Sequence, residues 1–148
     1  MKVKRGALVF KNVLGRTGEG DYNQWRSQII ELRNSVIKNN LYPTGPLFYN
    51  IQKSENGAYK YNIYIPVSNK LRIVNNDNYF FLEEFIIEDG LTLRHCGLED
   101  NIDDTNEILI ECALHNNIEL EDEIYNIFVD VYGEKIVDVF IPVKKELK

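Results

Sequence analysis

The hydrophobic pattern of the chain predicts two helices. In the first, apolar residues recur at alternating spacings of three and four, which places them on one helical face. Asp21 is a suitable N-cap for this helix, and Asn39-Asn40 is a suitable left-handed stop. A weaker stripe predicts the second helix over residues 101–115, again followed by paired asparagines, Asn116-Asn117. The apolar faces consist of Tyr22, Trp25, Ile29, Leu32 and Val36, and of Ile102, Leu109, Cys112 and Ala113.

Alternation of apolar and polar residues predicts strands on both sides of each helix. One strand precedes each helix, at residues 6–13 and 90–96, and a hairpin follows each helix. The hairpins turn at Asn56-Gly57 and at Tyr132-Gly133. The predicted hairpin strands cover residues 47–53, 59–67, 124–131 and 136–143. The predicted fold is therefore α+β, with two β-α-β-β units and antiparallel sheets.

An internal repeat supports this organisation. An offset of 76 residues aligns Tyr49-Asn50-Ile51 with Tyr125-Asn126-Ile127 and Ile65-Pro66-Val67 with Ile141-Pro142-Val143. We interpret the match as a duplication within one domain that covers residues 1–148. The first copy covers about residues 5–67 and the second about residues 90–145. Between them lie a linker and an extra strand, at 79–87, which turns through Asp89-Gly90 into the second copy.

Composition points to a reducing compartment. Cys96 and Cys112 show no paired spacing, and the N-terminus contains no segment apolar enough for a signal peptide or a membrane span. We therefore expect a cytoplasmic chain that does not enter a membrane. With 17 basic and 23 acidic residues, the net charge of −6 repels phosphate backbones and disfavours nucleic acid as a partner. The oligomeric state stays open.

Each predicted hairpin has an aliphatic row and a mixed row. We expect the aliphatic rows, which include Ile63 and Ile65 in one hairpin and Val139 and Ile141 in the other, to pack on the helices. The opposite rows combine aromatic and polar side chains, which is typical of a small-molecule site and equally of a half-solvated sheet face. The candidate ligand-binding residues are Phe48, Asn50, Asn62, Tyr64, Asn126, Phe128, Asp138 and Phe140.

The duplicated units, whose hairpins end in Ile-Pro-Val, resemble the gyrase-inhibitor-like (GyrI-like) superfamily, which includes effector-binding domains of multidrug-sensing transcription regulators. The resemblance covers about residues 5–145, and it is carried by Asp138-Val139-Phe140-Ile141-Pro142-Val143-Lys144 and by residues 42–49. Within the superfamily, residues 6–13 and 45–49 resemble a stand-alone Gram-positive family often encoded near LXG-type toxins of the type VII secretion route.

This resemblance implies a central cleft between the two units, on the sheet faces away from the helices, that takes bulky and often cationic aromatic compounds. Superfamily members commonly carry a carboxylate on the third strand of the second unit, where hairpin alignment places Asn126 in this chain. Cation recognition then falls to Asp138 on the adjacent strand or is absent. The same replacement disfavours the hydrolase chemistry of some relatives.

Other patterns receive structural interpretations, so no metal, cofactor or catalytic group is predicted. Adjacent strand residues point to opposite faces, so His95 and Cys96 cannot act together as base and nucleophile. The acidic run at 99–107 lacks the glycine and terminal glutamate of a calcium loop and suits a helix N-terminus. The glycines at 15–20 do not match a phosphate-binding loop and suggest a flexible connection.

The leading hypothesis is a non-enzymatic protein that binds a small apolar or aromatic ligand between its two repeats. The candidate aromatic side chains would stack on the ligand, and the candidate Asn and Asp side chains would orient it. The alternative is a protein-interaction role, as an adaptor or partner of a toxin-system protein. An exposed apolar patch away from the cleft would favour that alternative.

Overall fold

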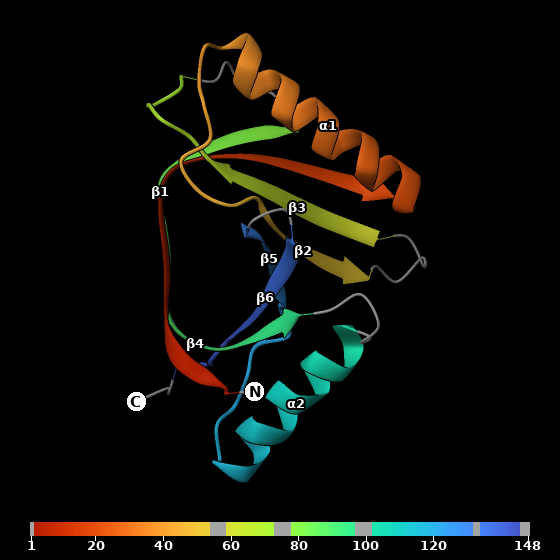
Figure 1. The fold of residues 1–148 in the computed structure, drawn as a ribbon, viewed down its shortest axis with the longest axis vertical. Coiled ribbons are helices and arrows are strands. Elements are labelled where there is room, and N and C mark those ends of the chain that lie inside the picture. Colours follow the sequence, from red (N-terminus) through yellow and green to blue (C-terminus); the bar gives the residue numbers. More distant parts are fainter. Residues whose placement is uncertain (1, 54–58, 73–77, 97–101, 132–133, 146–148) are drawn as a thin grey trace. The chain divides into compact units, whose positions relative to one another are not determined.

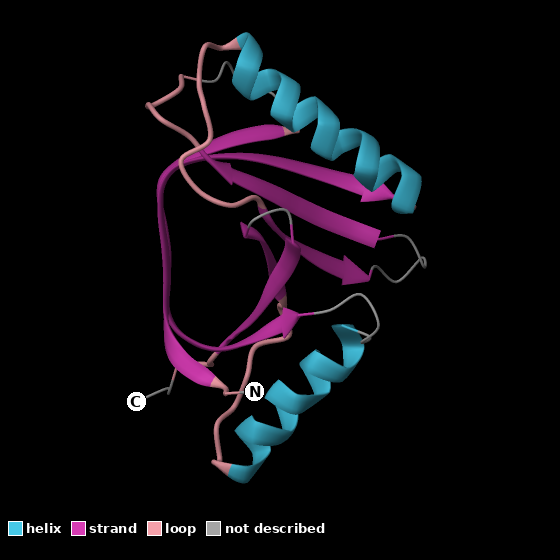
Figure 2. Ribbon diagram, viewed as in Figure 1, coloured by secondary structure: helices cyan, strands magenta, loops and turns pink. Residues whose placement is uncertain are grey.

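The computed structural model describes residues 2–53, 59–72, 78–96, 102–131 and 134–145, and its element order is that of an α+β protein (Figures 1 and 2). A strand, a helix and a two-stranded hairpin occur in this order twice, as predicted. The elements are β1 (Lys4–Gly20), α1 (Tyr22–Lys38), β2 (Phe48–Lys53), β3 (Tyr59–Pro66), β4 (Tyr79–Cys96), α2 (Ile102–His115), β5 (Tyr125–Val131) and β6 (Glu134–Pro142).

The chain divides into two compact units whose boundaries cut through strands. The N-terminal unit is Val9–Phe85, and the C-terminal unit combines Met1–Leu8 with Ile86–Lys148. In the N-terminal unit, β3 lies between β1 and β2, and all pairs are antiparallel. In the C-terminal unit, β6 lies between β4 and β5 in the same manner. The origin of this shared order by duplication stays an interpretation.

Helix α1 begins and ends where the sequence predicted. Asp21 and Gln24 form a capping box: the Gln24 backbone N–H donates to Asp21 Oδ1 at 3.0 Å, and the Asp21 backbone N–H donates to Gln24 Oε1 at 2.9 Å. At the other end, Asn39 is the C-cap, and Asn40 takes the left-handed conformation with φ 57°. These local signals fix the limits of the helix without help from tertiary packing.

The aliphatic row of the first hairpin faces α1, as predicted. Trp25 of α1 meets the Tyr49 ring edge-on, with centroids 4.9 Å apart, and Tyr49 pairs with Ile63 across the hairpin. Directly paired residues of antiparallel strands share a face, so Ile63 faces the helix too. Leu32 and Val36 are buried on the inner side of α1.

The second hairpin packs on α2 through a continuous aliphatic core. Its members are Leu91, Leu93, Leu109, Ala113, Val139 and Ile141, each at most 3% exposed. Val139 and Ile141 come from β6, and Leu109 and Ala113 come from the predicted inner face of α2. The predicted packing of the aliphatic row on the helix is therefore confirmed in this unit as well.

The structure overturns two predictions about glycine. Asp89-Gly90 is not a turn, because β4 continues through it and Gly90 pairs with Pro142; the glycine makes room for the Phe140 ring, whose nearest atom would lie 2.2 Å from an added Cβ. The glycines at 15–20 are not a flexible connection but part of β1, where Gly15 lies under the Phe80 ring. The predicted turns at Asn56-Gly57 and Tyr132-Gly133, and the linker residues 73–77, lie outside the described residues.

Candidate functional site

The first hairpin brings its four candidate residues together on one face. Phe48 pairs with Tyr64, and Asn50 pairs with Asn62, in alternate pairs of the β2–β3 ladder. Because Tyr49 and Ile63 face α1, the residues that alternate with them face away from it. The structure therefore supports the predicted surface, while ligand contact by these residues stays a prediction.

The aromatic rings on this face pack on one another and form one cluster. Phe48 stacks on Phe10 and on Tyr64, each with ring centroids 4.7 Å apart. Phe85 meets Phe48 and Tyr64 edge-on at 4.9 and 5.1 Å, and Phe80 meets Tyr64 edge-on at 5.7 Å. Phe48 is fully buried, whereas Phe10 and Phe80 are half-buried. Phe48 therefore lies inside the cluster, and Phe10 and Phe80 provide its accessible apolar surface.

Asn50 is the chemically unusual residue of this face. Its side chain is 3% exposed, yet its Oδ1 atom accepts no hydrogen bond from any described group. A buried amide oxygen without a donor costs about 1–3 kcal/mol relative to a satisfied one. Its pairing partner Asn62 is half-buried, and the next pair on this face is Phe48 with Tyr64. The site thus combines an apolar wall with an unsatisfied acceptor.

The second hairpin does not repeat this arrangement, and two candidate residues were placed on the wrong face. Asn126 pairs with Val139, and Phe128 pairs with Val137. Val139 belongs to the core on α2, with Val137 packed against it, so Asn126 and Phe128 lie on the helix-side face. They do not share a surface with Asp138 and Phe140, which alternate with these valines.

The cause is a register difference of one residue between the hairpins. The sequence repeat aligns Asn50 with Asn126, but Asn50 pairs with Asn62, whereas Asn126 pairs one position further along, with Val139 rather than Asp138. Lys53 pairs with Tyr59, and Val131 pairs with Glu134, so the first connection has an odd number of residues and the second an even number. A shift of one residue turns every side chain of a strand to the other face.

Asp138, the predicted partner of a cationic ligand, already forms an ion pair within the protein. Arg94 on the neighbouring strand donates from Nε to Asp138 Oδ1 at 2.8 Å and from Nη2 to Oδ2 at 3.2 Å. This is the bidentate geometry that matches a guanidinium to a carboxylate. The Asp138 side chain is 23% exposed and that of Arg94 is 55% exposed. The pair cancels the negative charge that would attract a cationic ligand to this face.

Phe140 is the remaining candidate, and it lies on the face predicted for it. The side chain is 3% exposed, and its ring covers Gly90 on the adjacent strand. Tyr125 on β5 is its paired neighbour. The C-terminal unit thus presents two paired rings, Phe140 and Tyr125, and one ion pair where the N-terminal unit presents a larger aromatic cluster.

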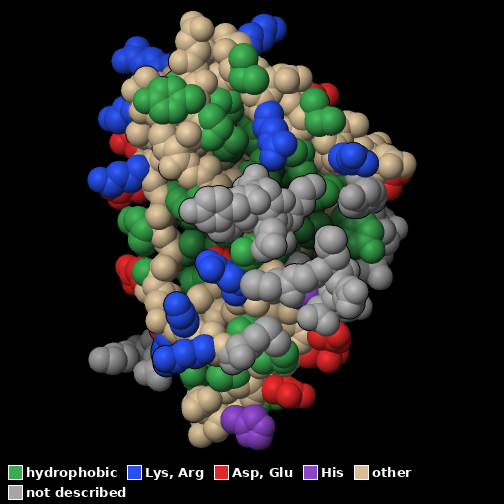
Figure 3. Space-filling model, in the orientation of Figure 1, with side chains coloured by type: hydrophobic (Ala, Val, Ile, Leu, Met, Phe, Trp, Pro, Cys, Tyr) green, Lys and Arg blue, Asp and Glu red, His purple; other side chains and the backbone are tan. Residues whose placement is uncertain are grey.

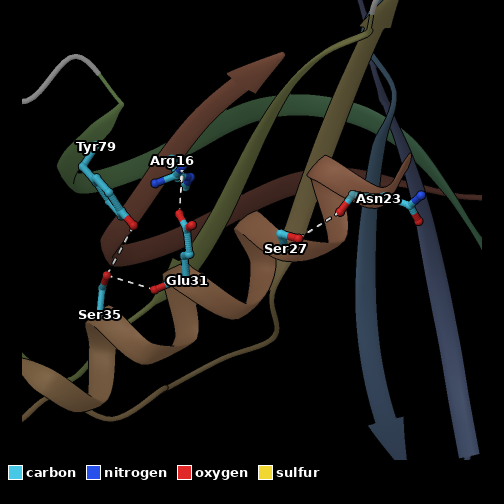
Figure 4. A network of polar contacts seen from close by, with 6 residues as sticks. All are labelled: Arg16, Asn23, Ser27, Glu31, Ser35 and Tyr79. Atoms are coloured by element: carbon cyan, nitrogen blue, oxygen red, sulfur yellow. Dashed lines mark hydrogen bonds and ion pairs between the residues drawn. The ribbon is translucent and has the colours of Figure 1, made fainter. Parts of the chain in front are cut away.

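A polar network between α1 and the sheet was missed by the sequence analysis (Figure 4). Arg16 of β1 donates to Glu31 of α1 at 2.9 Å, and its guanidinium carbon lies 4.9 Å from the centroid of the Tyr79 ring. Ser35 donates to the Glu31 backbone carbonyl at 2.9 Å and to the Tyr79 hydroxyl at 3.4 Å. The pairing of Arg16 with Ile63 places it on the helix side, a signal that strand alternation could have given.

The same region holds three buried polar atoms without partners among the described residues: Arg16 Nε, Gln28 Oε1 and Tyr61 Oη. Burial raises the pKa of the Tyr61 hydroxyl; the positive charge of Arg16 opposes this shift, and Asp21 adds to it. Tyr61 is therefore a neutral hydroxyl under α1. Donors and acceptors of opposite kind lie together here, which suits a buried bridging water better than an organic ligand.

The other chemically reactive residues have structural surroundings. His95 Nδ1 lies 2.9 Å from Thr105 Oγ1, which connects β4 to α2, and Thr105 is 3% exposed. In the described part of the chain, His, Cys, Asp and Glu form no group that could hold a metal ion. No described helix has the length and apolar character needed to span a membrane.

Solved structures of low sequence identity share this fold. EcmrR bound to DNA aligns with a TM-score of 0.71 at 16% identity over 97% of this chain, which spans 58% of that protein's length. The isolated EcmrR C-terminal domain aligns over 99% of this chain and all of its own, with a TM-score of 0.70 and 16% identity.

Two further solved structures have a similar fold. One, described as a hydrolase from Listeria innocua, has a TM-score of 0.67 and 11% identity, covering 97% of this chain and 92% of its own. The other is SAV2435 bound to tetraphenylphosphonium, with a TM-score of 0.52 and 10% identity, covering 97% and 94%. These likenesses, at 10–16% identity, show that the chain shares the fold of these proteins.

Comparison of the sequence with known protein families identifies the family of this chain. No curated protein matches the chain. A family model, however, matches residues 9–148, which is nearly the whole chain. The chain therefore belongs to the family described as Domain of unknown function (DUF5085).

Proposed function

We propose that this protein binds a small aromatic molecule and that the aromatic face of the N-terminal unit forms part of the binding surface. The observation that carries the proposal is Asn50, whose buried Oδ1 has no hydrogen-bond donor among the described residues and lies beside stacked rings. A ligand N–H or O–H group would satisfy this oxygen, and the outer rings would cover the ligand's apolar surface.

The fold gives independent support for a binding role. SAV2435, which has a similar fold, was solved with tetraphenylphosphonium, a bulky aromatic cation. In this chain, the negative charge that would attract such a cation is weak, because Arg94 neutralises Asp138. Asn126 is uncharged and lies on the helix side of its unit. We therefore propose a neutral aromatic ligand that donates a hydrogen bond, in preference to a lipophilic cation.

We further propose that the protein is cytoplasmic and that binding is not coupled to catalysis. His95 is engaged with Thr105, and Asp138 is engaged with Arg94, so neither is poised as a free base. The likeness to a Listeria hydrolase rests on 11% identity, which carries the fold and no chemistry. Incubation with aromatic esters should therefore give no turnover above the uncatalysed rate, measured by product absorbance.

A thermal-shift and calorimetric comparison of two probes tests the ligand class. We expect 2-phenylindole, a neutral aromatic N–H donor, to raise the melting temperature more than tetraphenylphosphonium does. Asn50→Leu should weaken 2-phenylindole binding by about tenfold, as expected for one lost hydrogen bond to a buried acceptor. No stabilisation by either probe would overturn the proposal.

Asn126→Leu is the matched control for this experiment. Asn126 also has an Oδ1 atom without a described donor, but it lies on the opposite kind of face, towards the core on α2. The substitution is chemically identical and should leave probe affinity unchanged. Equal losses in the two variants would mean that the Asn50 effect is structural.

A protein-interaction role is the second candidate, and the helices favour it. Large apolar side chains are exposed on both helices, among them Ile37 at 72% and Leu114 at 71%. Their exposure is the surface feature expected of an adaptor. A partner from an LXG toxin system stays a prediction of the sequence resemblance, and co-purification with the product of a neighbouring gene would test it.

A further inference from the structure

The outer face of α1 is both apolar and basic. Ile30 is 55% exposed and Ile37 is 72% exposed, and their spacing of seven residues places them on one stripe. Arg26 precedes Ile30 by four residues, and Arg33 precedes Ile37 by four residues. Both arginines therefore lie on the same stripe. Both arginines are exposed.

The outer face of α2 has the opposite charge on a similar apolar pattern. Ile110 is 44% exposed and Leu114 is 71% exposed, one turn apart. Glu107 and Glu111 are exposed beside them, again one turn apart. The segment Ile102–His115 contains no lysine or arginine, and its one basic side chain is His115 in the last turn. Figure 3 shows the red side chains over α2, and blue and green side chains together over α1.

Between the described residues, these charges form no ion pair. The ion pairs between described residues join other groups, such as Arg16 with Glu31 and Arg94 with Asp138, and none involves the four charged residues of the two outer faces. Exposed leucine and isoleucine side chains in such number on helices favour a covered surface. Each face therefore has apolar area to bury and charge left to pair.

We propose that the outer face of α1 in one copy of this protein binds the outer face of α2 in a second copy. Both outer faces combine exposed apolar and charged side chains, and the charges are opposite, so the two faces are complementary in charge. Pairing α1 with α1 would place arginines against arginines, and pairing α2 with α2 would place glutamates against glutamates. A second copy supplies the complementary face without any other partner.

This contact is heterologous, because the two surfaces that meet are different. Each copy carries one face of each kind, so the contact either closes into a ring of a few copies or extends along a filament. The net charge of −6 opposes unspecific self-association, and the local basic face of α1 overcomes it only in this pairing. The proposal does not depend on ligand binding, because the aromatic face lies on the other side of the sheet from α1.

Sedimentation velocity of the full chain over a range of concentrations tests the proposal. We expect the mean mass to rise with concentration in about 50 mM NaCl and to fall towards the monomer in about 500 mM NaCl, where surface charge is screened. A monomer at every concentration in low salt would overturn the proposal. Association that is insensitive to salt would point to a different, apolar interface and would overturn it too.

Two charge-reversed variants locate the contact. Arg26→Glu/Arg33→Glu makes the outer face of α1 acidic like that of α2, and Glu107→Lys/Glu111→Lys makes the outer face of α2 basic like that of α1. Each variant alone should associate at least about tenfold more weakly than the wild type. Mixed together, they should associate again, because each then offers the complement of the other.

Lys11→Glu/Lys144→Glu is the control for net charge. It changes the charge by the same amount as the α1 variant, at exposed positions outside the helices. It should associate like the wild type. Failure of the two helix variants to recover association on mixing, while both remain folded by circular dichroism, would show that the helices do not meet and that another protein covers them.

Discussion

The two units contain the same elements in the same order and differ in the hairpin face turned away from the helix. In the N-terminal unit, this face carries stacked aromatic rings and the unsatisfied Asn50. In the C-terminal unit, it carries the Arg94–Asp138 pair and two paired rings, Tyr125 and Phe140, with Phe140 over Gly90. The comparison shows that a repeated sequence motif does not repeat a surface when the connecting turn changes the register by one residue.

The largest effect is expected from removing the centre of the aromatic cluster. Phe48→Ala should lower the free energy of unfolding by about 3–5 kcal/mol, because Phe48 is fully buried and contacts three other rings. Urea denaturation measures the loss. Phe128→Ala is the matched change in the other hairpin, where the ring is only half-buried, and it should cost clearly less. Equal costs would remove the distinction between the two hairpins.

A smaller loss is expected from filling the space under Phe80. Gly15→Ala should destabilise the protein by about 1–3 kcal/mol, because the new methyl group would lie 2.2 Å from a ring atom of Phe80. Adding Phe80→Ala should make the Gly15→Ala change nearly neutral, which a double-mutant cycle measures. Gly6→Ala is the control, since no atom lies within 4 Å of its added Cβ. A clash-free Gly15→Ala would contradict the close packing of this face.

Ligand charge preference offers a third comparison. Arg94→Gln leaves Asp138 as an unpaired carboxylate on the sheet face of the C-terminal unit. Affinity for tetraphenylphosphonium should rise about threefold to tenfold, while affinity for 2-phenylindole stays constant. Calorimetric titration of both probes gives the ratio. An unchanged ratio would show that Asp138 does not face the bound molecule.

The smallest effect concerns pH and the Arg5–Asp89 pair. The hydrogen bond from Arg5 lowers the pKa of Asp89 below its usual 3.8. The pair therefore stabilises the folded state above about pH 4, and the contribution disappears as the pH falls through the lowered pKa. Because both side chains are about half exposed, the contribution is at most about 0.5 kcal/mol.

Comparison of unfolding curves between pH 5 and about pH 2 checks this prediction. Wild type should exceed Arg5→Gln in stability at the upper end and equal it at the lower end. Asp122→Asn, at an exposed position, serves as the control and should show no such convergence. A constant difference across this pH range would mean that Arg5 acts through packing.

The sequence predicted the elements better than the surfaces. The N-cap Asp21, the C-cap Asn39 and the left-handed Asn40 are local signals, so α1 could be placed to the residue. Strand alternation correctly predicted the two faces of the first hairpin. Phe48 is next to Tyr49 in β2, and Tyr64 is next to Ile63 in β3, so the two pairs lie on opposite faces. The faces of the second hairpin depended on the pairing of Asn126, which repeat alignment could not supply because the connection has a different parity.

The remaining errors concern two glycines whose structural role is set by tertiary contacts. Gly90 after Asp89 is typical of a turn, yet here it accommodates the Phe140 ring within a continuous strand. Gly15 is typical of a loop, yet it lies under Phe80. In both cases the deciding neighbour is about 50 residues or more away in the chain, so no local pattern could have identified it.

The assignment of Lys4–Leu8 to the same unit as Ile86–Lys148 has a consequence for synthesis on the ribosome. Val9–Phe85 emerges as one uninterrupted stretch and can fold while translation continues. Residues 4–8 must instead wait for the segment that follows Phe85, and Arg5 gains its carboxylate partner only after position 89 has left the exit tunnel. The C-terminal unit is therefore completed after the N-terminal unit, although it contains residues that are translated earlier.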